Sequence, residues 1–190
     1  MPQAIIKKWR ALAPAMSMPS RPSDPSNASY CARIFFVTTR TAGGRSLFQT
    51  DRMGGLFIEV LRSYMRSGKI TIHDFVIMPN HVHILMTVPG ETSIEKAMQL
   101  IKGSFSFRAG KELGFHGEIW QRGFSDEQVL DERSFQQHRE YIDNNPVKAG
   151  LASRPEEHPF GTAYLKRKKN AGAKARGLLG ASIGTTEVVP

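Results

Sequence analysis

The alternation of apolar and polar residues divides the middle of the chain into short strands and amphipathic helices. Residues 33–39, 69–78 and 81–88 are rich in apolar, aromatic and β-branched side chains, which predicts three strands. Turn-forming Pro-Asn and Pro-Gly pairs lie on either side of the third segment. These breaks indicate where the third strand begins and ends.

Three further segments repeat apolar residues at the spacing of a helix. The first runs to about Ser67 with Asp51 as its expected N-cap, and the second begins after Ser93, a residue type that also favours the N-cap position. The third covers about 134–144. Pro146 is expected to end it at the preceding residue, because a residue before proline disfavours helical geometry.

The order strand, helix, strand, strand, helix, followed by a later helix, predicts an α+β fold. We expect a ferredoxin-like antiparallel sheet covered by helices on one face, occupying residues 30–164. Residues 1–29 are rich in Pro and Ser and are expected to be a flexible lead. Residues 165–190 are expected to form a basic, low-complexity, unstructured tail. Its run of Lys and Arg at 166–169 either grips a phosphate backbone or is simply solvated.

The charge balance favours a polyanionic partner. The chain has 26 Lys and Arg against 17 Asp and Glu, a net charge of +9, and release of counterions drives such proteins onto phosphate backbones. Charge alone does not separate DNA, RNA and anionic membranes. The single cysteine, Cys31, excludes an internal disulfide and a multi-cysteine zinc site. No apolar run approaches the roughly 20 residues of a membrane span, so we expect a cytoplasmic protein without a membrane partner.

Two histidines begin the third predicted strand, in the sequence MPNHVHILM. Side chains alternate between the faces of a strand, so His81 and His83 are expected to share one face while Val82 and Ile84 anchor the other. Two imidazoles so placed can bind one divalent metal ion together with oxygen ligands. A His-x-His pair is weak evidence by itself, since in an arbitrary protein two half-exposed histidines beside a turn are more often the explanation.

A tyrosine and an asparagine stand four residues apart on the last predicted helix. Tyr141 and Asn145 therefore lie on one helical face, and the amide is expected at the C-terminal end, free to turn toward a metal. A phenol with its normal pKa near 10 is a poor nucleophile, but a metal that polarises a phosphate makes its attack feasible. The simpler account has Tyr141 packing in the core and Asn145 capping the helix.

The segments FFVTTR, FVIMPNHVHILM and IWQRGFSDEQVLDERSFQQHREYIDNNPVKAGL resemble the REP-associated tyrosine transposases, which belong to the single-tyrosine HUH transposases. The resemblance covers roughly residues 30–160, and both motifs stand in the expected order. It implies a central antiparallel sheet and cleavage of single-stranded DNA beside a hairpin, through a 5′-phosphotyrosine link that a later strand resolves. A monomer and a homodimer are both consistent with it.

The resemblance also implies a role for each motif residue. His81 and His83 would be metal ligands, Asn145 would supply an oxygen ligand, and Tyr141 would be the nucleophile. The implied metal is Mg²⁺ or Mn²⁺, which suits a site that leaves room for water and phosphate. The sequence does not indicate which residue accepts the proton of the tyrosine.

Residues near the motifs are candidates for contacting DNA. Trp120 and Arg122 in the WQRGF segment could stack on bases and hold phosphates, and Lys102 and Lys148 are further candidates. For Trp120, an anchor in the core is at least as good an interpretation. Two other functions compete with the transposase-like enzyme: a domesticated protein that binds palindromic repeats without cleavage, and an RNA-binding or RNA-cleaving domain. RNA hydrolysis needs no tyrosine, which disfavours the last.

Overall fold

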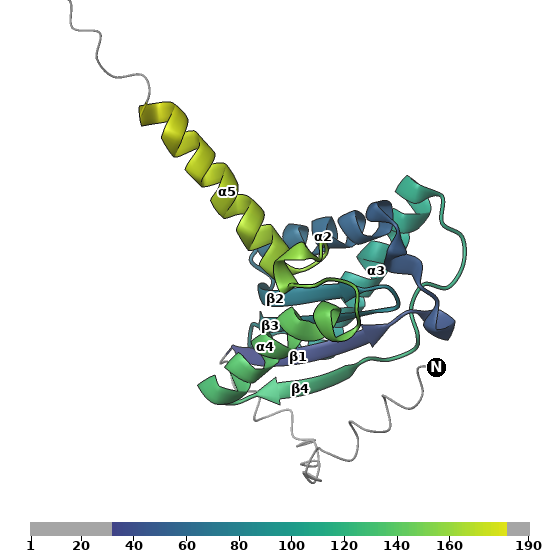
Figure 1. The fold of residues 1–190 in the computed structure, drawn as a ribbon. Coiled ribbons are helices and arrows are strands. Elements are labelled where there is room, and N and C mark those ends of the chain that lie inside the picture. The colour runs from purple at the N-terminus through teal and green to yellow at the C-terminus, as the bar shows by residue number, and fades with distance from the viewer. Residues whose placement is uncertain (1–31, 182–190) are drawn as a thin grey trace, which may run out of the picture.

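The computed structural model describes residues 32–181, with side chains for residues 32–171. A four-stranded antiparallel sheet of order β2-β3-β1-β4 forms the centre of the molecule (Figure 1). The strands are β1 (Arg33–Arg40), β2 (Thr71–Met78), β3 (His81–Val88) and β4 (Ser125–Val129). The helices are α2 (Asp51–Arg66), α3 (Ile94–Leu113), α4 (Glu132–Lys148) and α5 (Thr162–Ala181), with short 3-10 turns η2 (Ala42–Gly44), η3 (Leu47–Gln49) and η4 (Pro155–Glu157).

The predicted α+β class, the antiparallel sheet and the three strands are confirmed. The N-cap at Ser93 is also confirmed, because its hydroxyl accepts a hydrogen bond from the backbone N–H of Lys96 at 3.1 Å. The N-cap of α2 is Thr50 rather than Asp51. The Thr50 hydroxyl accepts from the Met53 N–H, and Asp51 instead places its negative charge in the first turn.

Helices cover both faces of the sheet, so the prediction of helices on one face is wrong. Helices α2 and α3 pack on one face, where alternate β3 residues such as Ile84 meet a large apolar core. Helix α4 packs on the other face, where its Ile142 meets Leu85 in a separate cluster. Figure 1 shows α4 in front of the sheet, with α2 and α3 on its far side. The middle residues of β3 are apolar on both sides, as a strand covered twice requires.

The core under α2 and α3 is built around aromatic rings. Phe57 and Phe105 are fully buried, and their ring centroids lie 5.1 Å apart in an edge-to-face arrangement. Phe48 and Trp120 complete the group, each within 6 Å of both phenylalanine rings. Burial of large rings of this kind is a major source of stabilisation for a hydrophobic core.

Strand β2 contains a bulge that changes which face its residues take. Ile72 pairs with Met86 and Asp74 pairs with Leu85, so His73 is an extra residue in the ladder. If the same sequence paired in a regular ladder without the bulge, His73 would stand opposite Leu85, and Asp74 would stand opposite Ile84 and point at the aromatic core. The bulge therefore directs Asp74 to the face that α4 covers.

Strand β4 was not anticipated, because its sequence SDEQV has no apolar alternation. It lies at the edge of the sheet, where only Val129 is buried. Its pairing with β1 rests on backbone hydrogen bonds, which do not require particular side chains and so cannot be predicted from the sequence of the strand.

Helix α4 continues to Lys148, so the prediction that it ends at Asn145 is wrong. Pro146 sits inside its last turn, and its ring is buried. The Asn145 carbonyl still accepts from the Ala149 N–H at 3.0 Å, so the proline removes one hydrogen bond without ending the helix. Tertiary packing here outweighs the local preference.

The predicted unstructured tail is wrong over 165–181, which belongs to α5. The Thr162 hydroxyl ties the start of this helix to β2, accepting from the Phe75 N–H at 2.7 Å and donating to the Phe75 carbonyl at 3.1 Å. The Ala, Lys, Arg and Leu residues that follow are good helix formers. The flexible lead predicted at 1–29 and the tail beyond 181 lie outside the described residues.

A bilayer-spanning helix is not found between residues 32 and 181, since none combines the required length with sufficient hydropathy.

Candidate functional site

The paired histidines lie at the start of β3, on the face that α4 covers. Strand alternation places both there, as predicted, and their ring centroids are 4.8 Å apart. His83 is buried, with 4% of its surface exposed, whereas His81 is half-buried at the end of the strand. The pair therefore runs from the buried face of β3 to the partly exposed end of this strand.

Each imidazole is held by a hydrogen bond at its Nδ1 atom. His81 Nδ1 lies 2.7 Å from the Asn80 side-chain oxygen, which can only accept, so this nitrogen carries the proton. His83 Nδ1 lies 2.8 Å from Thr38 Oγ1 on the neighbouring strand. When Nδ1 is the protonated nitrogen, Nε2 keeps a free lone pair. Side chains that hydrogen-bond metal-bound histidines in proteins fix the ring in this way.

Both histidines are neutral at physiological pH. Burial, and after it the positive charge of Arg40, lower the pKa of His81 to about 4. Burial is also the largest cause for His83, and together with the neighbouring His81 and Arg40 it lowers the pKa of His83 to about 3. Neutral imidazole is the form that binds metal ions.

Tyr141 reaches this pair from α4. Its ring centroid lies 5.2 Å from that of His83 and 5.8 Å from that of Phe36, in both cases edge to face. Lys148 places its ammonium 5.6 Å from the same ring. Tyr141 is 38% exposed, so the ring sits at the boundary between the sheet and solvent rather than in the core.

Asn145 lies one turn after Tyr141 on the same side of α4 and is half-buried. Its side chain makes no hydrogen bond with any other residue in the described part of the chain. The simpler account, in which Tyr141 is a core residue and Asn145 caps the helix, does not describe either residue here. The fold thus brings the rings of His83 and Tyr141 together, with His81 against His83 and with Asn145 one turn further along α4.

The donor set fits a divalent metal with oxygen ligands. His83 Nε2 is buried and has no hydrogen-bond partner, which is costly unless a further ligand meets it. Across residues 32–181, no cluster of three or more His, Cys, Asp and Glu side chains could hold a metal. Two imidazoles with a neighbouring amide would leave positions open for phosphate and water.

Two further histidines near this face have partners of their own. His73 Nε2 lies 2.7 Å from the Thr87 hydroxyl. His138 stacks on Phe36 with centroids 4.3 Å apart, and its Nε2 lies 3.4 Å from a Glu127 carboxylate oxygen.

Of the residues expected to contact DNA, Trp120 and Lys102 have structural partners. Trp120 is 7% exposed in the aromatic core and donates from its indole nitrogen to the Lys102 carbonyl. Its buried ring offers no face to a base, which matches the alternative of a core anchor. The Lys102 ammonium donates to the carbonyls of Gln121 and Gly123, at 3.0 and 2.8 Å. It thereby fixes the loop that carries Arg122.

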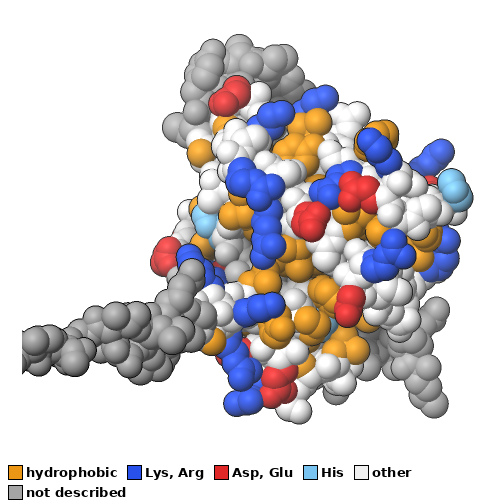
Figure 2. Space-filling model, turned by 90° about the horizontal axis from the view of Figure 1, so that it is seen from above, with side chains coloured by type: hydrophobic (Ala, Val, Ile, Leu, Met, Phe, Trp, Pro, Cys, Tyr) orange, Lys and Arg blue, Asp and Glu red, His pale blue; other side chains and the backbone are white. Residues whose placement is uncertain are grey.

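Arg122 is exposed on that loop, and Lys148 is exposed near Tyr141. On the face seen in Figure 2, Lys and Arg side chains are spread over the surface, with fewer Asp and Glu side chains among them. The basic character is therefore distributed on this face rather than gathered in one stripe.

Sequence reasoning missed Asn80 and Thr38, the partners of the two imidazoles. Asn80 was interpreted only as a turn residue, although it directly precedes His81. Thr38 faces His83 across the β1–β3 ladder, and this register becomes known only with the fold. Threonine within a strand otherwise signals no more than β propensity.

Residues 32–145 match the family described as "Transposase IS200 like". A REP-associated tyrosine transposase of Escherichia coli is 26% identical over 131 residues, covering 68% of this chain and 76% of the relative. A putative REP-associated tyrosine transposase of Haemophilus influenzae is 27% identical over 144 residues, covering 65% and 82%. The solved structure of a REP-associated tyrosine transposase bound to a REP hairpin shares the fold, with a TM-score of 0.60, 24% identity and coverage of 82% and 87%. These similarities confirm the resemblance found in the sequence. The family match spans more than half of the residues of this chain, and the chain therefore belongs to the IS200-like transposase family.

Proposed function

We propose that this protein cleaves and rejoins single-stranded DNA next to a hairpin, using Tyr141 as the nucleophile and a divalent metal ion. The observation that carries the proposal is the meeting of Tyr141 from α4 with His83 from β3, whose rings lie 5.2 Å apart. Membership of a transposase family supports the reaction class. The hairpin is inferred from the solved relative, which is described as bound to a REP hairpin.

The chemistry assigned to Tyr141 is a transesterification. The phenol oxygen forms a bond to phosphorus while the bond from phosphorus to the 3′ oxygen breaks. The phenol loses its proton, and the released 3′ oxygen gains one. The number of phosphodiester bonds is unchanged, so a second 3′ hydroxyl can reverse the step without ATP. The exposed position of Tyr141 leaves room for a DNA backbone beside it.

The metal would be held by His81 and His83 through their Nε2 atoms, with Asn145 as an oxygen ligand. Mg²⁺ or Mn²⁺ so bound would polarise the scissile phosphate and stabilise the leaving oxygen. The chain itself keeps both imidazoles neutral and correctly rotated, through burial and through the hydrogen bonds that their Nδ1 atoms make with Asn80 and Thr38.

A covalent adduct assay tests the proposal. The protein is incubated with Mn²⁺ and a labelled single strand that contains a hairpin with flanking sequence, and denaturing gels reveal any protein–DNA adduct. Tyr141→Phe should abolish the adduct and leave hairpin binding largely intact, because only a hydroxyl is lost. Tyr164→Phe, which removes the same atom from a half-buried ring on α5, is the matched control and should retain the adduct.

His81→Ala should also abolish the adduct, and a chelator should reproduce that loss in the unaltered protein. An adduct formed by Tyr141→Phe would refute the assignment of the nucleophile. Tight hairpin binding with no adduct under any metal condition would instead favour a domesticated DNA-binding protein. Binding should weaken with salt at a log–log slope of about −0.7 per phosphate contact with a single strand.

A further inference from the structure

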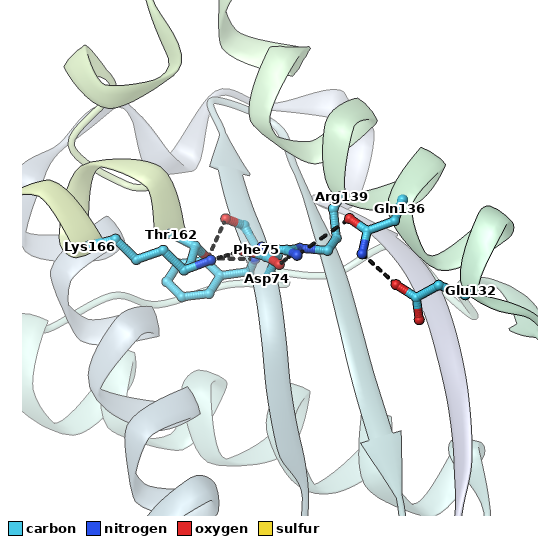
Figure 3. A network of polar contacts seen from close by, with 7 residues as sticks. All are labelled: Asp74, Phe75, Glu132, Gln136, Arg139, Thr162 and Lys166. Carbon is cyan, nitrogen blue, oxygen red and sulfur yellow. Dashed lines mark hydrogen bonds and ion pairs between the residues drawn. The ribbon is translucent and has the colours of Figure 1, made fainter.

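A buried carboxylate joins three elements of the structure at the edge of the sheet. Asp74 on β2 is 1% exposed. One of its oxygens accepts from Arg139 Nε on α4 at 2.6 Å, and the other accepts from Lys166 Nζ on α5 at 2.7 Å. Figure 3 shows the two cations approaching the carboxylate from opposite sides. The acid is buried, whereas the side chains of Arg139 and Lys166 are 36% and 52% exposed.

The position of this acid depends on the bulge in β2. The extra residue, His73, places Asp74 opposite Leu85 and therefore beneath α4. A buried carboxylate requires partners, because an unpaired charge is strongly disfavoured away from water. The local backbone is thus arranged so that the acid and the cation on α4 meet.

Helix α4 has few apolar contacts that could fix its position instead. Two of its residues, Ile142 and Pro146, are buried, against seven of α2 and six of α3. Two further polar contacts near Arg139 run along the helix, from Arg139 to Gln136 and from Gln136 to Glu132 (Figure 3). The neighbouring His138 also approaches the sheet, but its partner is the exposed Glu127 on the edge strand β4, at 3.4 Å. The Asp74–Arg139 ion pair is therefore a polar tie from α4 to the sheet, and it lies two residues from Tyr141.

We propose that Asp74 and Arg139 are positioning residues, which set the rotation and place of α4 so that Tyr141 meets His83. The inference rests on the proposed function, since it gives Tyr141 a reaction to perform. Neither residue touches the reacting atoms in this account. A small displacement of a reacting group, about 1 Å, can cost about 100-fold in rate.

The two cations on Asp74 provide a matched pair of variants. Arg139→Gln and Lys166→Gln each remove one positive charge from the same carboxylate, but only Arg139 lies on α4. With saturating hairpin DNA and Mn²⁺, Arg139→Gln should slow single-turnover adduct formation by about tenfold or more, and Lys166→Gln by about twofold or less. The Kd for the hairpin should change equally in both. Arg139→Lys, which restores the charge, should recover part of the rate.

Amide hydrogen exchange gives a readout that does not depend on cleavage. Arg139→Gln should speed exchange in the second half of α4, and Lys166→Gln should leave it unchanged. Equal effects of the two variants on rate and on exchange would overturn the positioning role while leaving the proposed function standing. Absence of any adduct with the unaltered protein would instead defeat the proposed function, and the exchange comparison alone would then decide whether Arg139 fixes α4.

Discussion

The two faces of the sheet are built from the same strands but serve different ends. On β3, Val82, Ile84 and Met86 enter the aromatic core beneath α2 and α3. The alternate residues of β3 face α4. They include His81 and His83 at the start of the strand and Leu85 further along. The first face is continuous and apolar. The second face has a small apolar cluster around Leu85 and Ile142. The histidine site lies at one end of this cluster, and the buried carboxylate of Asp74 lies opposite Leu85.

Within a single strand, one face therefore stabilises the fold and the other carries the residues of the candidate site. The apolar face holds the backbone of β3 in place, so the opposite face can hold one buried and one half-buried imidazole, the buried one with an unpartnered nitrogen. Such groups cost free energy that a small cluster around Ile142 could not offset alone. Substitutions on the two faces should therefore affect unfolding and adduct formation in different proportions.

The largest effect on stability is expected from Phe57→Ala in the aromatic core. Phe57 is fully buried against Phe48, Phe105 and Trp120, so the cavity should cost about 4 kcal/mol of unfolding free energy. Urea unfolding measures this cost. The adduct rate per folded molecule should be unchanged, and a large fall in that rate would show that the two faces are not independent.

Ile142→Ala beneath α4 should cost less stability and more activity. The cluster around Ile142 is small, so we expect a loss of about 2 kcal/mol, at the low end for an isoleucine truncation. Because α4 carries Tyr141, the adduct rate per folded molecule should fall as well. Urea unfolding and single-turnover assays below the transition measure the two quantities. Unchanged adduct formation would contradict the idea that packing of α4 sets the site.

The buried histidines should make the metal-free protein less stable as pH falls. The unfolded chain binds a proton at each histidine near pH 6.5, whereas the folded pKa of His83 is about 3. Stability contributed by neutral His83 is therefore complete above pH 6.5 and declines below it. In the presence of chelator, His83→Gln should lose about 2 kcal/mol less than the unaltered protein between pH 7 and pH 5. Equal losses would contradict this, and His116→Gln at an exposed position controls for the substitution itself.

The smallest effects come from two adjacent threonines on opposite faces. Thr38 is hydrogen-bonded to His83, whereas the buried Thr39 hydroxyl has no partner. Thr38→Val should cost about 1 kcal/mol and weaken Mn²⁺ binding about tenfold. Thr39→Val should be neutral or stabilising by about 1 kcal/mol, since it removes an unpaired polar group. Calorimetric titration and thermal melts measure both, and equal weakening of Mn²⁺ binding would contradict a specific role for Thr38.

The strands and helices that could be predicted are those whose own side chains indicate the secondary structure, by residue type or by spacing. Strands β1, β2 and β3 are dense in β-branched and aromatic residues, and helical spacing marked α2, α3 and α4. Strand β4 and helix α5 escaped prediction because they depend on the fold: β4 pairs with β1 through its backbone, and Thr162 ties the start of α5 to β2. Pro146 led to a wrong prediction of where α4 ends for a related reason. Its ring is buried against the rest of the protein, and this packing keeps the last turn of the helix intact.

For the site, periodicity predicted that His81 and His83 share a face and that Tyr141 and Asn145 share another. It could not bring the two pairs together, because their convergence depends on α4 crossing the sheet face opposite α2 and α3. The resemblance to a family supplied that step. The roles of Asp74, Arg139 and Thr38 lay beyond both, since each depends on a contact between residues distant in sequence.

The bulge at His73 has a consequence for comparing chains of different length. Removing this one residue would leave Ile72 opposite Met86 and Asp74 opposite Leu85, with every later partner unchanged. A deletion there would straighten the ribbon without inverting any side chain, whereas a deletion further along the strand would turn over the residues that lie between it and the bulge. A one-residue gap between this chain and a shorter relative, if it falls in β2, therefore disturbs the fewest side chains at position 73.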